Sequence, residues 1–192
     1  MRSILLLLAM MLAGCATTAT PQPEDLFLTR LQALCGKAFE GRIASPQVAA
    51  DANFAGKRLV MHVRQCSAET IRIPFHVGED RSRTWVLTRT TNGLRLKHDH
   101  RHEDGSEDRL TQYGGDSAEG GTAQRHTFPS DQFTKELLVR EGNTAGVNNI
   151  WALEVHPGQL FAYELRRPGR FFRVEFDLTR PIAAPPPAWG TQ

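Results

Sequence analysis

The chain has 192 residues and a formal net charge of +2, from 23 Lys and Arg against 21 Asp and Glu. A near-neutral charge without a basic block argues against a nucleic-acid partner. The length is sufficient for one domain with a sizeable hydrophobic core.

The N-terminal segment is typical of an export signal. Met1-Arg2-Ser3 is a short basic start, and Ile4 to Leu12 form an apolar run that is too short to span a bilayer as a stable helix. The run ends in Leu12-Ala13-Gly14-Cys15, which resembles the bacterial lipobox. The resemblance implies cleavage after residue 14 and a lipid on Cys15. An ordinary secretory signal with a chance cysteine is the alternative.

The lipobox resemblance also predicts a location. Ala16 stands where an inner-membrane retention signal has Asp, so we expect an outer-membrane anchor on the periplasmic face. Removal of the signal leaves a net charge of +1, and the membrane becomes a partner through the Cys15 lipid. We expect the chain to divide into a signal peptide (1–14), a lipidated tether (15–23), one β-barrel domain (24–181) and a Pro-rich tail (182–192).

Two cysteines remain once Cys15 is assigned to lipid. Cys35 and Cys66 in an oxidising compartment predict a disulfide. Closing a loop of about 31 residues would stabilise the fold by roughly 3–4 kcal/mol in the chain-entropy model. A reactive or metal-binding thiol pair is the alternative, although no C-x-x-C spacing supports it.

The rest of the chain reads mainly as short strands. Residues 24–36 carry apolar side chains at helical spacing and end at Gly36. A second short helix is expected from Ser130 to about Arg140, with Phe133 and Leu137 on its buried side. Strands are predicted at 57–66, 70–77, 83–91, 94–102, 107–113, 122–128, 149–155, 159–166 and 170–178.

Eight or nine antiparallel strands in meander order predict an all-β, up-and-down barrel with an N-terminal helix, because closure removes the edge strands. A two-sheet β-sandwich is the alternative. The stretch from Leu34 to Gly41 resembles the start of calycin-type barrels, with Phe39 where many of them carry Trp. Residues 78–108 and 163–178 resemble an uncharacterised family of bacterial envelope lipoproteins, which implies a compartment but no activity.

Three histidines on one strand mark the candidate site. His98, His100 and His102 alternate along the strand, so they share a face. The preceding Asn92-Gly93 turn predicts a hairpin that pairs Trp85 with His100 on that inward face. Extending the pairing past the next turn predicts an inner patch of Trp85, His98, His100, His102, Glu107, Arg109, Thr111 and Tyr113.

Three hypotheses compete for this patch. The first is non-catalytic binding of a small polar or anionic, amphipathic ligand, with Arg109 and the imidazoles fixing its orientation. The second is a metal- or histidine-dependent enzyme, in which His98, His100, His102 and Glu107 hold a divalent transition metal. Arg109 argues against a cation there, and no cofactor is expected.

The third hypothesis is a self-satisfied polar network without a ligand, in a structural envelope protein whose tail or Ser130 helix docks a partner. His126 is a further candidate cofactor ligand. An axial haem ligand at His126 is conceivable, but a lone histidine on a strand is usually structural.

Overall fold

A computed structural model describes residues 20–191 of the chain. Two α-helices, α1 (Pro23–Gln32) and α2 (Gln132–Arg140), accompany two 3₁₀ turns, η1 (Ala49–Asp51) and η2 (Thr144–Asn148). The predicted signal peptide and lipidation site, Cys15, lie outside the described residues. The strands are β1 (Ala38–Ile43), β2 (Leu59–His62), β3 (Gln65–Cys66), β4 (Thr70–Val77), β5 (Asp80–Thr90), β6 (Gly93–His100), β7 (Tyr113–Asp116), β8 (Arg125–Pro129), β9 (Ile150–His156), β10 (Leu160–Arg167) and β11 (Arg170–Ile182).

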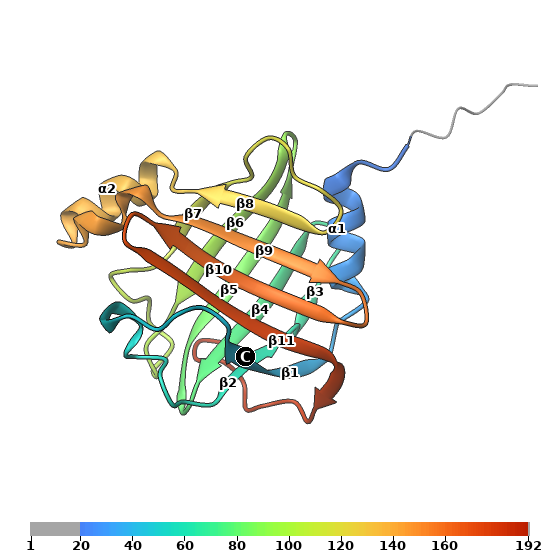
Figure 1. Cartoon of the computed structure of the whole chain (residues 1–192), viewed down its shortest axis with the longest axis horizontal. Helices are drawn as coiled ribbons and strands as arrows, with labels where there is room; N and C mark the ends of the chain where they lie inside the picture. Colours follow the sequence, from blue (N-terminus) through green and yellow to red (C-terminus); the bar gives the residue numbers. More distant parts are fainter. Residues whose placement is uncertain (1–19, 192) are drawn as a thin grey trace, which may run out of the picture.

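The strands form a nearly closed antiparallel barrel (Figure 1). Their order is β7-β6-β5-β4-β2-β1-β11-β10-β9-β8, with β3 paired to β4 off this path. The predicted all-β barrel is confirmed, with 11 strands in place of the expected eight or nine. A meander satisfies its backbone groups locally, and the pairing of β1 with β11 joins the two halves.

Strand β7 contains two glycines at which neighbouring backbones lie very close, β6 at Gly114 and the end of β8 at Gly115. A Cβ at Gly114 or at Gly115 would lie 1.9 Å from the carbonyl oxygen of Leu96 or of Pro129, respectively. Because glycine has no Cβ, the backbones can approach closely there. The Asp131 N–H then donates to the Gly114 carbonyl at 3.0 Å, which links the end of β8 to β7.

The predicted strand over 107–113 is not formed, and only Tyr113 lies in a strand. Residues 101–112 form a connection instead. Asp108 accepts the Leu110 N–H on its side chain at 2.8 Å, a local turn that competes with the sheet ladder. Gln112 has a φ of 58°, so the chain turns back before β7 begins.

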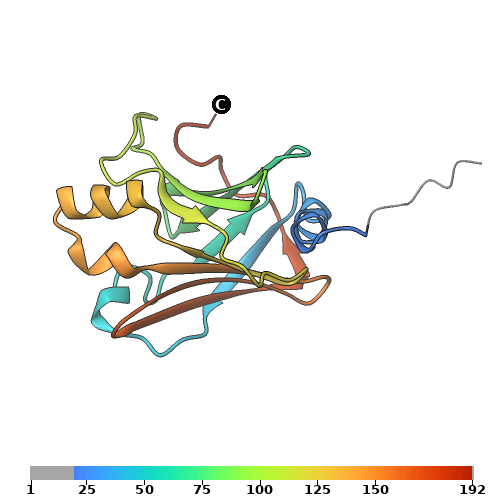
Figure 2. The same ribbon diagram turned by 90° about the horizontal axis from the view of Figure 1, so that it is seen from above.

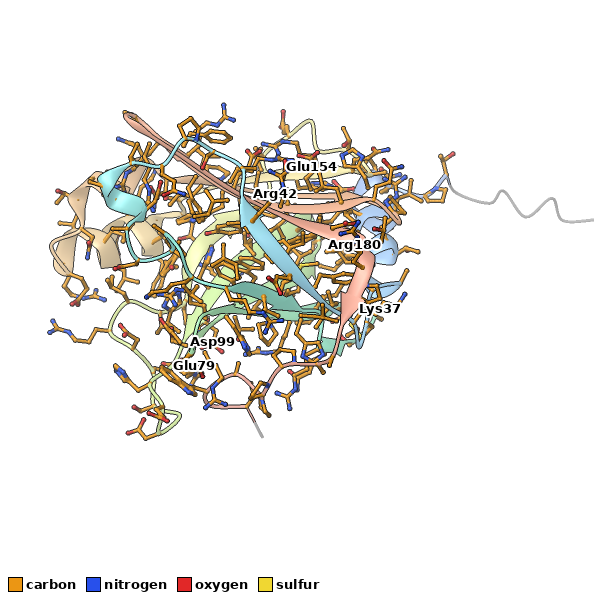
Figure 3. All side chains as sticks on the ribbon, turned by 60° about the horizontal axis from the view of Figure 1, so that its bottom comes forward. Lys37, Arg42, Glu79, Asp99, Glu154 and Arg180 are labelled. Carbon is orange, nitrogen blue, oxygen red and sulfur yellow. A yellow bond between two sulfur atoms is a disulfide. The ribbon has the colours of Figure 1, made fainter. Side chains whose placement is uncertain are left out.

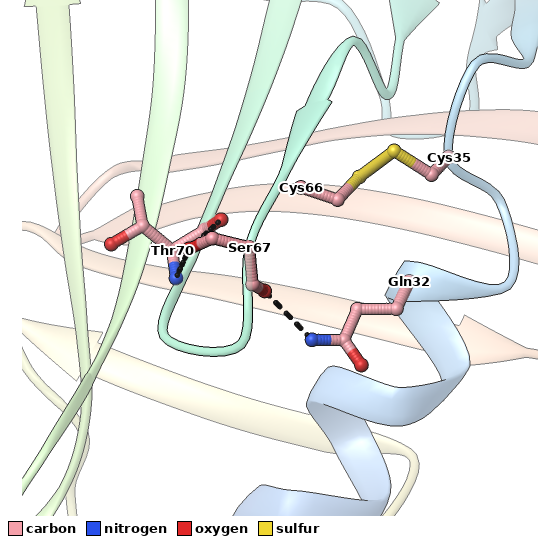
Figure 4. Close-up of a disulfide and its surroundings, with 5 residues drawn as sticks. All are labelled: Gln32, Cys35, Cys66, Ser67 and Thr70. Atoms are coloured by element: carbon pink, nitrogen blue, oxygen red, sulfur yellow. Dashed lines mark hydrogen bonds between the residues drawn. A yellow bond between two sulfur atoms is a disulfide. The ribbon is translucent and has the colours of Figure 1, made fainter.

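Helix α1 covers one end of the barrel (Figures 1 and 2). Phe27 and Leu31 are fully buried in the core there. The predicted Cys35–Cys66 disulfide is present, with a Cα–Cα distance of 6.2 Å, and it joins the segment after α1 to β3 (Figure 4). Gln32 adds a hydrogen bond to the Ser67 carbonyl at 2.8 Å.

Helix α2 lies at the opposite end of the barrel (Figure 1). Asp131, and not Ser130, is its N-cap, and its carboxylate accepts the Thr134 N–H at 2.8 Å. Leu137 is buried as predicted, but Phe133 is 51% exposed and contacts Lys97. None of the helices within residues 20–191 is long and apolar enough to cross a membrane.

The Pro-rich tail folds back on the barrel. Ala188 is buried, and the Trp189 N–H donates to the Arg81 carbonyl at 3.1 Å. Arg81 in turn donates to the Pro187 carbonyl. The tail therefore lies against the start of β5, beside the hairpin that joins β4 and β5.

The outer face of β8–β11 carries a network of ion pairs (Figure 3, where Glu154 is labelled). Arg173 contacts Glu154 at 2.9 Å and Glu175 at 2.8 Å, and it also pairs with the buried Glu164. Burial alone would raise the pKa of Glu154, but its contacts to Arg173, His156 and Arg125 lower the pKa to about 2. These charges satisfy one another on the outside, away from the barrel interior.

Candidate functional site: a cavity at the end opposite helix α1

A cavity of about 390 Å³ lies inside the barrel at the end near α2 and η1. Its lining combines aromatic rings with charged and amide side chains from distant parts of the sequence. The polar lining residues are Asn53, Arg83, His98, His100, Asp108, Asn143, Asn149, Arg167 and Arg170. The aromatic lining residues are Phe54, Phe75, Trp85, Tyr113, Trp151, Tyr163 and Phe172.

The hairpin at Asn92-Gly93 directs the histidine strand into this cavity, with a register that differs from the prediction. Thr90 pairs with Gly93, so Trp85 lies opposite His98, whereas the prediction placed it opposite His100. The shift is two residues. Because side chains alternate with a period of two, such a shift keeps every side chain on its predicted face. The inward orientation of Trp85 and His98 is confirmed.

His98 is fully engaged by protein groups. Its Nδ1 lies 3.1 Å from the Tyr113 carbonyl oxygen, which can only accept, so Nδ1 carries the proton. Its Nε2 therefore accepts the Tyr163 hydroxyl at 2.9 Å. Burial is the main cause that lowers the pKa of His98 to about 3, so the ring is neutral at pH 7. This histidine fixes two walls of the cavity and has no nitrogen left for a metal.

His100 has one ring nitrogen available to the cavity. Its Nε2 lies 3.0 Å from the Tyr113 hydroxyl, while Nδ1 makes no hydrogen bond to any residue of 20–191. Burial and the nearby charge of Arg83 lower its pKa to about 4. Burial also raises the pKa of Tyr113 to about 12. The pair thus offers neutral hydrogen-bonding groups to the cavity.

Stacked rings form the apolar part of the lining. The Trp85 ring stacks on Tyr163 with centroids 4.5 Å apart and on Phe75 at 4.7 Å. The His98 ring stacks on Tyr113 at 4.5 Å. Offset stacking of this kind holds large, rigid apolar surfaces in place. A flat ligand would therefore meet a preformed aromatic wall.

Three arginines at the cavity were missed in the sequence. Arg83 pairs with Asp80, and Arg170 pairs at 2.6 Å with the fully buried Asp51. Arg167 has no carboxylate within 4.0 Å among residues 20–191. The signal that could have found two of them is the Arg167-Pro-Gly-Arg170 turn, since a tight turn places the residues flanking it at the end of the barrel.

Three of the predicted site residues point away from the cavity. His102, Glu107 and Arg109 are exposed, so the prediction that they face inward is wrong. Arg101 pairs with Glu107 at 3.0 Å, and Arg109 pairs with Glu141 of the segment after α2 at 2.8 Å. The reason is the loop at 101–112, which ends the alternation of the strand after His100.

The remaining predicted residues do meet at one place. Trp85, His98, His100 and Tyr113 line the cavity, and the Thr111 hydroxyl accepts the His100 N–H at 2.9 Å beside it. The alternative metal set of His98, His100, His102 and Glu107 is not brought together. Within residues 20–191, no group of three or more His, Cys, Asp or Glu side chains is arranged to hold a metal ion.

His126 lies apart from the cavity. It is 1% exposed and packs against Phe27 of α1 with ring centroids 4.9 Å apart. A Cβ at Gly121 would lie 2.2 Å from its Nδ1, so the chain also covers the ring on that side. Its position is that of a packed residue under the helix, and no cavity residue accompanies it for a haem.

Comparisons with protein-family models, with curated proteins and with solved structures found no match. The chemistry of the cavity is therefore inferred from its own residues and their geometry.

Proposed function

We propose that this protein is a lipid-anchored periplasmic protein, attached to the outer membrane through Cys15, that binds a small amphipathic ligand without catalysing a reaction. The ligand's apolar body lies on the aromatic wall of the cavity, and an anionic group pairs with Arg167. The volume of about 390 Å³ falls in the range of small-molecule sites. Cavities with an apolar lining and a few convergent polar groups are the usual form of such sites.

The unpaired guanidinium of Arg167 is the observation that supports this proposal most. Burial and the neighbouring charge of Arg170 lower the pKa of Arg167, and the nearby negative charge of Asp51 offsets them only in part. An anion in the cavity would offset both effects. Guanidinium groups bind carboxylate, sulfonate and phosphate groups through charge-assisted, often bidentate hydrogen bonds.

Binding is favoured over catalysis by the state of the histidines. His98 has both ring nitrogens engaged, and both cavity histidines are neutral at pH 7 with pKa values near 3 and 4. A general base works best with a pKa near the operating pH. These rings therefore suit a role as fixed hydrogen-bonding walls.

The proposed compartment is supported by the Cys35–Cys66 disulfide, because structural disulfides persist in oxidising compartments such as the periplasm. The anchor is tested separately from the cavity. Metabolic labelling with a clickable palmitate analogue in a bacterial host should label the chain, and Cys15→Ala should abolish the label. An unlabelled chain would contradict the anchor and leave the cavity unaffected.

The ligand proposal is tested with two matched fluorescent probes. The first, 8-anilinonaphthalene-1-sulfonate, has flat rings and one anionic group; the second, N-phenyl-1-naphthylamine, is the same molecule without the sulfonate. We expect the sulfonate probe to bind the folded protein at one site. Arg167→Gln should raise the dissociation constant of the sulfonate probe by about tenfold, the equivalent of roughly 1.4 kcal/mol. The dissociation constant of the neutral probe should change less than twofold.

Arg166→Gln is the matched control. Arg166 is the adjacent arginine on the outward side of β10, with 60% of its side chain exposed. It is not part of the cavity lining, so the variant should bind both probes as the unmodified protein does. Absence of binding by the sulfonate probe, or equal binding to the Arg166 and Arg167 variants, would contradict the proposal.

A further inference from the structure

The cavity also contains an unpaired charge of the opposite sign. Asp108 lines the cavity, and no Arg, Lys or His side chain lies within 4.0 Å of its carboxylate among the described residues. One carboxylate oxygen accepts the Leu110 N–H at 2.8 Å, which holds the side chain in place. The other oxygen has no hydrogen-bond partner in residues 20–191. Arg167 and Asp108 are thus two opposite charges in one cavity, each without an ion-pair partner among the described residues.

These two charges enter the cavity from different walls. Asp108 belongs to the connection after β6, where its N–H donates to the His100 carbonyl at 3.0 Å. Arg167 ends β10, at the hairpin with β11. The shorter path around the barrel from β6 to β10 crosses β7, β8 and β9. The two charges therefore come from different walls of the cavity and are not neighbours on one strand.

The other cavity arginines do not change this balance. Arg83 is neutralised by Asp80, and Arg170 by Asp51. A simple anion would pair with Arg167 but leave Asp108 facing it without a counterion. A ligand that carries an ammonium group as well as an anionic group would satisfy both walls, because each charge finds a partner of opposite sign.

A buried amide gives an independent sign that a polar ligand completes this cavity. Asn149 is 7% exposed and lines the cavity, yet its Oδ1 has no hydrogen-bond partner within the described chain. Ile150 pairs with Arg166, so Asn149 lies next to Arg167 at the end of the same pair of strands. Buried polar atoms are almost always partnered, and a bound polar group explains one that is not.

Aromatic rings make up much of the remaining lining of the cavity. Trp85, Tyr113, Trp151 and Tyr163 line the cavity, and the Tyr113 and Trp151 ring centroids are 5.6 Å apart. Ring faces of this kind attract both flat apolar groups and ammonium groups, the latter through the cation–π interaction. A ring-bearing body with a charge at each end matches this arrangement.

We infer that the ligand is a zwitterion, whose anionic group pairs with Arg167, whose ammonium group pairs with Asp108, and whose flat body lies on the aromatic wall. This inference rests on the proposed function and narrows its ligand from amphipathic anions to zwitterions of the amino-carboxylate type.

Three small probes of one shape test the inference. They are 4-(aminomethyl)benzoate, which carries both charges, 4-methylbenzoate, which lacks the ammonium, and 4-methylbenzylamine, which lacks the carboxylate. Dissociation constants come from chemical-shift titration of the indole N–H signals of Trp85 and Trp151, a measurement that also follows weak binding. The zwitterion should bind at least about tenfold more tightly than either single-charge probe.

The variant Asp108→Asn, with a matched control, tests whether the ammonium group of the zwitterion pairs with Asp108. Asp108→Asn keeps an oxygen that can accept the Leu110 N–H, so the loop should keep its shape. The Asp108→Asn variant should bind the zwitterion about tenfold more weakly and should bind 4-methylbenzoate equally well or more tightly. Glu103→Gln is the matched control, because Glu103 is an exposed acid of the same loop outside the cavity, and it should bind all three probes as the unmodified protein does.

The outcomes separate this inference from the proposed function. If 4-methylbenzoate binds as tightly as the zwitterion, or if Asp108→Asn weakens both probes equally, the inference is wrong and the anion-binding function stands. If none of the three probes binds while 8-anilinonaphthalene-1-sulfonate does, the inference is likewise wrong. If the sulfonate probe also fails to bind, both proposals fall.

Discussion

The two ends of the barrel are closed in different ways. At one end, α1 buries Phe27 and Leu31, and the Cys35–Cys66 disulfide ties the segment after the helix to β3. At the other end, α2 and the neighbouring loops leave a cavity of about 390 Å³ with two unpaired charges. An end filled by apolar side chains stabilises the fold, whereas an end with unsatisfied polar groups costs stability and can be completed by a ligand.

This contrast separates residues that hold the barrel from residues that serve the cavity. Variants at the α1 end should change stability and leave probe binding intact. Variants at the cavity end should change probe binding or the pH dependence of stability more than the stability at pH 7. Three measurements test that division, beginning with the largest expected loss of stability.

Phe27→Ala should cause the largest loss in the free energy of unfolding. Phe27 is fully buried under α1, and truncation of a buried Phe to Ala typically costs about 3–5 kcal/mol. Urea denaturation measures the loss, and Leu26→Ala is the control because Leu26 on the same helix is 39% exposed. The control should cost less than about 1 kcal/mol. Equal losses in the two variants would contradict the role assigned to the α1 end.

The double variant Cys35→Ser/Cys66→Ser should cost about 3 kcal/mol, because the crosslink closes a loop of 31 residues in the unfolded chain. Urea denaturation with and without reductant provides the measurement, and reductant should not change the double variant further. Binding of 8-anilinonaphthalene-1-sulfonate to the folded variant should stay within twofold. A folded variant that has lost probe binding would show that the two ends are coupled.

The buried histidines at the cavity end should make the stability of the protein depend on pH. The pKa of His98 is lowered from 6.5 to about 3, mainly by burial, and that of His100 to about 4. Between pH 6.5 and these values the unfolded chain binds protons that the folded chain does not. Stability should therefore fall as the pH falls through this window, by on the order of 1 kcal/mol per pH unit for each histidine.

His98→Gln tests this assignment. The variant should lower stability at pH 7, because the hydrogen bonds to Tyr113 and Tyr163 are altered, but it should reduce the slope of stability against pH between 6.5 and 4. His102→Gln is the control, since His102 is exposed in the connection that follows the same strand. A slope unchanged by His98→Gln would show that other groups cause the acid response.

Much of the fold could be predicted because it depends on local patterns. The strand at 70–77 and the final meander show a clear two-residue alternation, and Phe161, Tyr163, Phe172 and Phe176 all face the core. The alternation of apolar and polar residues predicts which face a side chain lies on, but not which residues pair across strands. The hairpin at Asn92-Gly93 was therefore assigned to the correct face even though its pairing was wrong by two residues.

The site was predictable only in part, for a related reason. Trp85, His98 and His100 lie on regular strands, so their inward direction follows from alternation. Tyr113 was predicted from a strand over 107–113 that is not formed, and it lines the cavity as the first residue of β7. His102, Glu107 and Arg109 lie where the side-chain hydrogen bond of Asp108 competes with the ladder. Such local competition has no periodic signal, and the extrapolation of the strand through it failed.

The amino-acid sequence by itself determined the barrel class, the disulfide partners and the strand that carries the histidines, because alternation, turn residues and cysteine count are properties of the chain alone. Only the tertiary structure decided what surrounds that strand. Arg83 of β5, Arg167 of β10 and Asp108 of the connection after β6 come together because barrel closure places these segments around one cavity. Which charges stay unpaired there depends on three-dimensional neighbours, and the proposed ligand is inferred from those unpaired charges.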